Sequence, residues 1–273
     1  MYSAGSIFKT PKRTQGRIVG THQRLDRIAR HIFGRRLKNV DFPTTKEILH
    51  FEGERGPDAI KKKSPGVDDP LHFIQPEQDD GKLIKIILDH QFNLRTALKK
   101  GNRERAAFEA AWLAHAVTDG LTPAHHFPWE EAIGELMSEN DFFKVFGHPI
   151  KGIMHGHNAA ETARNNWLYW GANGYMSKHV AFEYGVGLIV STSTEKSLSP
   201  IIQPHELDNI NLKAEFYKAL DKIYRLDMYG RFRREGWNAS LAFDTTEVLV
   251  PEIIRLIVIA WASAIPEDKD ERH

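Results

Sequence analysis

The most informative stretch of this sequence runs from His115 to His125 and reads HAVTDGLTPAH. His115 and Asp119 are four residues apart in an alanine-rich segment that we expect to be helical, so both side chains project from one face. Pro123 ends that helix, because it has no backbone N–H to donate, and lets His125 turn back toward the same face. Imidazoles and a carboxylate in this arrangement can hold zinc, and the carboxylate can bridge two cations. The alternative is a pair of core histidines around a helix C-terminus.

Composition restricts the chemistry that is available. The 273 residues include no cysteine and 14 histidines. The absence of cysteine excludes disulfides, thiol catalysis and thiolate metal ligands, so any zinc must be held by nitrogen and oxygen. Zinc with such ligands lowers the pKa of a bound water to about 7 and makes hydroxide available at neutral pH. The sequence contains no G-x-S-x-G elbow, Walker loop or dinucleotide-binding glycine motif that would favour another chemistry.

Two further pairs combine an imidazole and a carboxylate four residues apart, His179 with Glu183 and His157 with Glu161. Such pairs are also common on solvated helix faces, so the spacing alone does not show which of the two binds metal.

Three more candidate ligands lie upstream. His22 stands at the predicted start of the first helix, whereas Asp58 and His72 lie 14 residues apart in a long loop. Taken singly, each is better explained as a solvated residue. They become candidate ligands only in combination with the downstream pairs.

Taken together, these residues resemble the zinc-dependent phospholipase C family and, more distantly, the S1/P1 nucleases that share its helical fold. The family pattern His-x3-Asp-x3-Pro-x-His is matched by His115, Asp119, Pro123 and His125. Three further motifs occur in the same chain order, and they are matched by Gly20-Thr21-His22, by Asp58 with His72-Phe73, and by His179 with Phe182-Glu183. The last match favours His179 and Glu183 over the pair at 157 and 161. The resemblance runs from about residue 20 to residue 185.

This resemblance implies two or three zinc ions. Asp58, His72, His115 and Asp119 would hold the first ion, His125, His179 and Glu183 the second, and His22 and Asp119 the third, with Asp119 as a bridge. In the family an N-terminal Trp completes the third site. The first Trp of this chain is Trp112, so we expect that site to be weakened or absent unless another upstream group replaces the Trp. Asp58 is also the candidate for orienting or deprotonating the attacking water.

The activity that the resemblance implies is phospholipase C, which cleaves the headgroup from a phospholipid and contacts the membrane peripherally. A nuclease of the S1/P1 type, or another phosphodiesterase with the same metals, is the alternative, and nucleic acid would then be the partner. A non-catalytic, zinc-stabilised binding module is a third interpretation. Aromatic side chains that could stack on bases, although a place in the core explains them more simply, are Trp129, Trp167, Tyr169 and Trp170.

Helical periodicity dominates the rest of the sequence and strand-like alternation is scarce, so we expect one all-α, multi-helix domain at 20–273. Helices are expected at 21–35, 81–98, 103–119, 130–137, 159–170, 175–184, 212–226 and 247–263. Residues 185–205 are expected to form a surface excursion. The segment 127–178 is longer than is usual in the family and leaves room for a lid. Histidines in or beside it that either assist the site or lie on the surface are His126, His148, His155 and His157.

Basic residues are concentrated near the N-terminus. Residues 1–40 hold ten basic side chains and one acidic, a charge of +9, although the whole chain carries +1. We expect residues 1–19 to be a flexible basic segment that suits phosphate, a lipid headgroup or nucleic acid, or that docks on an acidic body. It has no apolar h-region, which favours a cytoplasmic protein unless a targeting segment is missing from the chain. No apolar run reaches the roughly 18 residues of a membrane span, and 253–265 is expected to be a buried helix.

Overall fold

The computed structural model describes residues 20–52, 56–57, 73–78, 81–136 and 153–266. Every regular element in these ranges is a helix and none is a strand, which confirms the expected all-α class. The symbol η marks two 3-10 helices, η2 and η3, and one π-helix, η4. The elements in chain order are α1 (Thr21–Arg36), α2 (Thr45–Glu52), α4 (Lys82–Lys99), α5 (Arg103–Gly120), η2 (Pro123–His126), α6 (Trp129–Gly134), α8 (Ala159–Trp170), α9 (Tyr175–Thr192), α10 (Glu195–Leu198), η3 (Pro204–Leu207), α11 (Leu212–Tyr224), α12 (Met228–Glu235), α13 (Ala239–Asp244), η4 (Thr245–Leu249) and α14 (Val250–Ser263).

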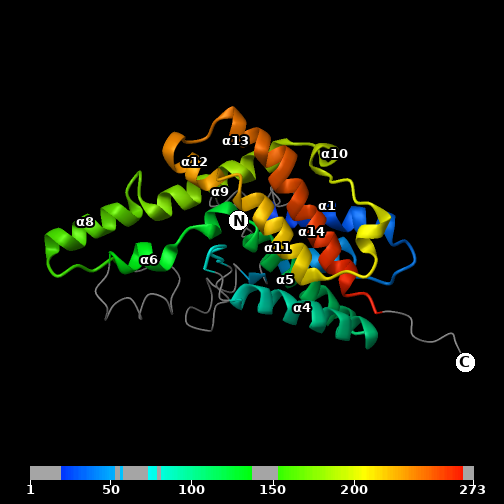
Figure 1. The fold of residues 1–273 in the computed structure, drawn as a ribbon. Helices are drawn as coiled ribbons and strands as arrows, with labels where there is room; N and C mark the ends of the chain where they lie inside the picture. Colours follow the sequence, from blue (N-terminus) through cyan, green and yellow to red (C-terminus); the bar gives the residue numbers. More distant parts are fainter. Residues whose placement is uncertain (1–19, 53–55, 58–72, 79–80, 137–152, 267–273) are drawn as a thin grey trace, which may run out of the picture.

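Helix α5 lies at the centre of the bundle and contacts α1, α2, α4 and α14 (Figure 1). Most of its side chains from Ala106 to Gly120 are buried, because its alanines let the neighbouring helices approach closely. The closest approach is at Gly120, where a Cβ would stand 2.7 Å from Leu83 Cδ2 and 3.0 Å from the ring of Phe216. Helices α4 and α11 therefore pack directly against the end of α5 that carries Asp119.

Helix α14 is the apolar helix that the sequence predicts near the C-terminus, and its burial confirms the expectation for 253–265. The indole Nε1 of Trp261 donates a hydrogen bond to the backbone oxygen of Ala110 at 2.9 Å, which ties α14 to α5. Arg255, the basic residue of this helix, makes ion pairs with three carboxylates, those of Glu206, Glu215 and Glu252. None of the described helices combines the length and the apolarity that crossing a membrane requires.

The expectation of a surface excursion at 185–205 is wrong. Helix α9 continues to Thr192 and buries Val186 and Val190. Leu198 and Ile202, farther along, are also buried. Gly185, within α9, makes room for a contact between helices, since a Cβ there would lie 2.1 Å from the indole of Trp237.

Four α-helices, α2, α10, α12 and α13, were not predicted from periodicity, and they are only four to eight residues long. Such lengths give too few turns for a periodic pattern to be recognised. The segment expected as one helix at 247–263 is divided, because the π-helical turn η4 precedes α14.

Helices α6 and α8 extend away from the bundle, at the left of Figure 1. They share a separate hydrophobic cluster whose buried members are Trp129, Ile133, Leu136, Met154, Tyr169 and Met176. Of the four aromatic residues considered for stacking, the two outside this cluster, Trp167 and Trp170, are 71% and 43% exposed. Both helices fall within 127–178, the segment with room for a lid, and residues 137–152 of that segment, which include His148, lie outside the described ranges.

Candidate metal centre

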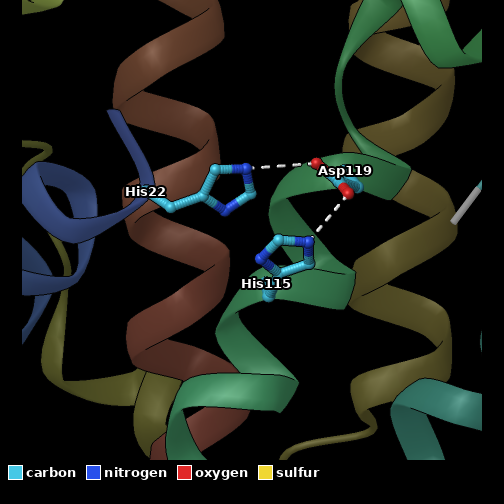
Figure 2. Close-up of side chains that lie close together, drawn as sticks. All are labelled: His22, His115 and Asp119. Carbon is cyan, nitrogen blue, oxygen red and sulfur yellow. Dashed lines mark ion pairs between the residues drawn. The ribbon is translucent and has the colours of Figure 1, made fainter. Parts of the chain in front are cut away.

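His22, His115 and Asp119 come together at the centre of the bundle, and all three are buried (Figure 2). The two oxygens of Asp119 face different imidazoles. Oδ2 lies 3.0 Å from His115 Nε2, and Oδ1 lies 3.2 Å from His22 Nε2. The two imidazole rings stack with their centroids 4.1 Å apart. The predicted association of these three residues is therefore present, although they come from two helices.

The local sequence explains how each side chain reaches this position. Asn102 caps α5 by accepting a hydrogen bond from the backbone N–H of Arg105, so α5 is a regular helix whose i, i+4 spacing puts His115 and Asp119 on one face. Helix α1 begins at Thr21, which places His22 in its first turn. The packing of α1 against α5 then brings that turn beside the end of α5.

A second buried cluster contains His125, His179 and Glu183. One oxygen of Glu183, Oε1, lies 3.0 Å from His125 Nε2 and 3.1 Å from His179 Nε2. The two rings are nearly parallel, with centroids 5.3 Å apart. His179 and Glu183 are on α9 and His125 is on η2, so the cluster joins the two elements that the motifs predict.

The turn that carries His125 forms as the sequence predicts. Helix α5 ends at Gly120, and Pro123 begins η2, which brings His125 back toward α9. The next residue, His126, faces elsewhere, and its Nε2 donates a hydrogen bond to the Gly120 backbone oxygen at 2.9 Å. Burial lowers the pKa of His126 to about 4, so this side chain is a neutral cap on α5.

The pKa shifts favour ionised carboxylates in both clusters and a neutral imidazole at His125. Burial alone would raise the pKa of Asp119, but nearby positive charge, including that of the His115 imidazole when it is protonated, holds it well below its usual value. Burial would likewise raise the pKa of Glu183, yet nearby positive charge and the hydrogen bonds with His125 and His179 hold it well below its usual value. Burial lowers the pKa of His125 in spite of both carboxylates. Ionised carboxylates and neutral imidazoles are the forms that ligate metal.

A functional residue that sequence reasoning missed lies behind the first cluster. Glu52, at the end of α2, is fully buried, and its Oε1 accepts a hydrogen bond from His115 Nδ1 at 2.9 Å. The same oxygen lies 3.6 Å from His22 Nδ1. Asp26, one turn after His22 on α1, is buried as well, and burial together with the charge of Glu52 raises the pKa of Asp26 well above its usual value.

One signal could have located the helix that carries Glu52. Thr44 followed by Glu47 is a capping-box pattern, in which the residue before a helix and the third residue of the helix exchange hydrogen bonds. The structure shows this exchange, since the backbone N–H of Thr44 donates to Glu47 Oε2 at 2.7 Å. No local signal indicates that Glu52 would be buried beside two imidazoles, because those belong to other helices.

The donor atoms of the first cluster fit a metal ion. When the His115 imidazole is neutral, Glu52 accepts the proton on its Nδ1, so the lone pair is on Nε2 and faces Asp119 Oδ2 at 3.0 Å. Two acceptors at this distance repel each other unless a proton or a cation lies between them. Two ligand atoms bound to one tetrahedral zinc at about 2.0–2.1 Å stand roughly 3.3 Å apart. The distances in both clusters are close to this value.

The remaining predicted residues divide into two groups. Asp58 and His72 lie outside the described residues. His157 and Glu161 are described, and Glu161 Oε2 accepts a hydrogen bond from the His157 backbone N–H at 2.7 Å. That contact belongs to the start of α8, where the imidazole of His157 is exposed, as is His155 nearby. The pair at 157 and 161 is thus a helix-end structure.

Comparisons of the chain with models of protein families, with curated proteins and with solved structures find no match.

Proposed function

We propose that this chain is a zinc-dependent phosphodiester hydrolase, and specifically a phospholipase C with the all-α fold of the family that its motifs resemble. Two adjacent, buried clusters of imidazoles and carboxylates support this proposal. The observation that carries most weight is the position of Asp119, which offers one oxygen to each of two imidazoles on different helices. A carboxylate placed in this way can bridge two cations, as a multinuclear phosphodiesterase requires.

Each cluster supplies ligands of the type that zinc prefers. His125, His179 and Glu183 would hold one ion. His115 and Asp119 would hold another, together with Asp58 and His72 if the motif match extends to them, and His22 with Asp119 would contribute to a third. Bound zinc would lower the pKa of a coordinated water to about 7 and would neutralise charge on the phosphate oxygens.

The chain itself contributes orientation and exclusion of water. The hydrogen bond to Glu52 holds the His115 ring with Nε2 toward Asp119. Two aromatic rings pack around the second cluster. The centroid of the Phe73 ring lies 4.6 Å from that of His125, and the Trp129 ring contacts the His179 ring edge-on with centroids 5.2 Å apart. These aromatic contacts restrict the rotation of the imidazoles and limit the access of solvent.

A nuclease of the S1/P1 type is the second candidate. Trp167 and Trp170 are exposed on α8, one helical turn apart. Exposed tryptophans can enter a lipid interface, as a phospholipase requires, or can stack on unpaired bases, as a nuclease requires. A zinc-stabilised binding module without turnover would use the same metal ligands and would need neither a lipid nor a nucleic acid as partner.

Metal content and turnover, measured on one preparation, test the proposal. Elemental analysis should find two or three zinc ions per chain, and hydrolysis of a chromogenic phosphocholine ester should stop on chelation. A second assay should compare phospholipid vesicles with single-stranded nucleic acid as substrates. Zinc without turnover on any phosphodiester would favour the binding module, and a protein that takes up no zinc would exclude both interpretations.

A further inference from the structure

A cationic side chain lies along the face of α9 that carries the second cluster. Tyr175, His179 and Glu183 occupy successive turns of this helix, so their side chains line one face. The guanidinium carbon of Arg233, on α12, lies 5.6 Å from the centre of the Tyr175 ring. Four residues of helix rise about 6 Å, so the residue that this guanidinium contacts stands one helical turn before His179.

Arg233 is held in place by aromatic rings and by no carboxylate within the described ranges. Its guanidinium lies 4.4 Å from the centre of the Phe127 ring, in addition to its contact with Tyr175. The neighbouring Arg234, by contrast, donates a hydrogen bond to Asp227 Oδ2 at 2.8 Å. Because stacking uses the face of a guanidinium and leaves its N–H groups at the edge, Arg233 keeps its donors available for an anion.

A cavity of about 160 Å³ opens beside this arginine. Its lining includes Arg233, Phe127, Tyr229 and the neutral imidazole of His126. Asp227 also lines it, and that carboxylate is already paired with Arg234. Arg233 is therefore a cation of this lining whose donors that carboxylate does not occupy.

Tyr229 links this cavity to the second cluster. Burial raises the pKa of its hydroxyl, Arg233 opposes the increase, and Glu183 adds to it. The Tyr229 ring, which lines the cavity together with Arg233, lies with its centroid 5.4 Å from that of Phe182, the residue before Glu183. The rings of Phe127 and Tyr229, which both line the cavity, pack against each other with their centroids 5.9 Å apart.

We propose that Arg233 is a phosphate-binding residue of this centre, which holds non-bridging oxygens of the substrate phosphate beside the second cluster. This inference rests on the proposed function. A guanidinium matches phosphate because its planar fork can donate two parallel hydrogen bonds to the anionic oxygens of a phosphodiester. The role is to bind and position the phosphate, with no proton transfer assigned to the arginine.

The test compares Arg233→Gln with Arg36→Gln, a change at an exposed arginine of α1 that does not line the cavity. Calorimetric titration of the zinc-loaded protein with inorganic phosphate should show binding about tenfold weaker for Arg233→Gln and unchanged for Arg36→Gln, since a charged hydrogen bond is worth at least about 1.4 kcal/mol. The KM for bis(4-nitrophenyl) phosphate should rise by a similar factor, with a smaller change in kcat. Arg233→Lys should recover part of the affinity, because an ammonium keeps the charge and loses the fork.

Three results would overturn the inference or separate it from the proposed function. Equal phosphate affinity in the two glutamine variants would remove Arg233 from the site. If Arg233→Gln binds inorganic phosphate more weakly but keeps the KM for bis(4-nitrophenyl) phosphate, the arginine binds free phosphate only. That result would overturn its role in binding the substrate. If the chain takes up no zinc and hydrolyses nothing, the proposed function fails, and the phosphate titration of the metal-free variants still decides whether Arg233 binds this anion. Zinc content and thermal unfolding of each variant show whether the fold and the ligands are intact.

Discussion

Glu52 Oε1 accepts a hydrogen bond from His115 Nδ1 at 2.9 Å, although the two residues are 63 positions apart in the sequence. Both side chains are completely buried. A carboxylate in this position fixes which imidazole nitrogen carries the proton and directs the other nitrogen toward Asp119. It also adds negative charge next to a place where the proposed function puts cations.

The first prediction follows from this contact. Glu52→Gln should lower zinc affinity by about 10-fold to 100-fold, because an amide is neutral and orients the imidazole less strongly. Competition with a chromogenic chelator measures the change. Glu195→Gln is the matched control, since Glu195 Oε1 lies 3.0 Å from His31 Nδ1 in a pair exposed on the surface. Equal zinc affinity in the two variants would leave Glu52 as a packing residue.

The second prediction distinguishes the two His/Glu pairs. His179→Ala should lose one zinc per chain and reduce hydrolysis by at least about 100-fold, the order of loss expected when a catalytic metal is released. His157→Ala should keep both zinc and activity, because its imidazole is exposed at the start of α8. Elemental analysis and initial rates provide the readouts. Retention of full zinc content by His179→Ala would contradict the second cluster as a metal site.

The third prediction concerns pH and the ion pairs of α14. Burial opposes ionisation of Glu206, but its hydrogen bonds to Gln203 and Arg255 and the charge of Arg255 lower its pKa below the usual 4.5. Because the folded-state pKa is the lower one, Glu206 contributes stability above pH 4.5 and loses it as the pH falls through the folded value. Glu206→Gln should therefore cost about 1 kcal/mol of unfolding free energy at pH 7, and the cost should disappear in acid.

Urea unfolding of the chelated protein at a series of pH values measures this effect without interference from metal. Asp221→Asn serves as the control, since the pair of Asp221 with Arg225 is largely exposed and such pairs contribute little. A cost for Glu206→Gln that stays constant from pH 7 down into acid would show that the contact stabilises by packing, without a contribution from charge.

The fourth prediction compares two glycines on α9. Gly185→Ala places a Cβ 2.1 Å from the Trp237 indole, and we expect a loss of about 1–3 kcal/mol and weaker zinc binding at the second cluster as α9 shifts. Gly187→Ala meets only the Thr21 hydroxyl at 3.0 Å, so its higher helix propensity should offset that contact. Thermal unfolding and zinc titration measure both effects. Equal stability of the two variants would mean that Trp237 can move away.

The sequence by itself determines the local part of the site. Because a helix repeats every 3.6 residues, spacing alone places His115 with Asp119 and His179 with Glu183 on common faces. Pro123 likewise determines where α5 must end, and His125 follows in η2. The all-α class follows from the same periodicity.

Only the tertiary structure decides which of these local pairs is buried and what surrounds them. The pair at 157 and 161 has the same spacing as His179 and Glu183, yet packing leaves it at an exposed helix start and buries the other. Glu52 and Arg233 enter the site from helices too short to be recognised by their pattern. The physical reason is that periodicity reports the geometry of one backbone segment, whereas a carboxylate becomes buried against an imidazole only when separate helices pack together and exclude water from both.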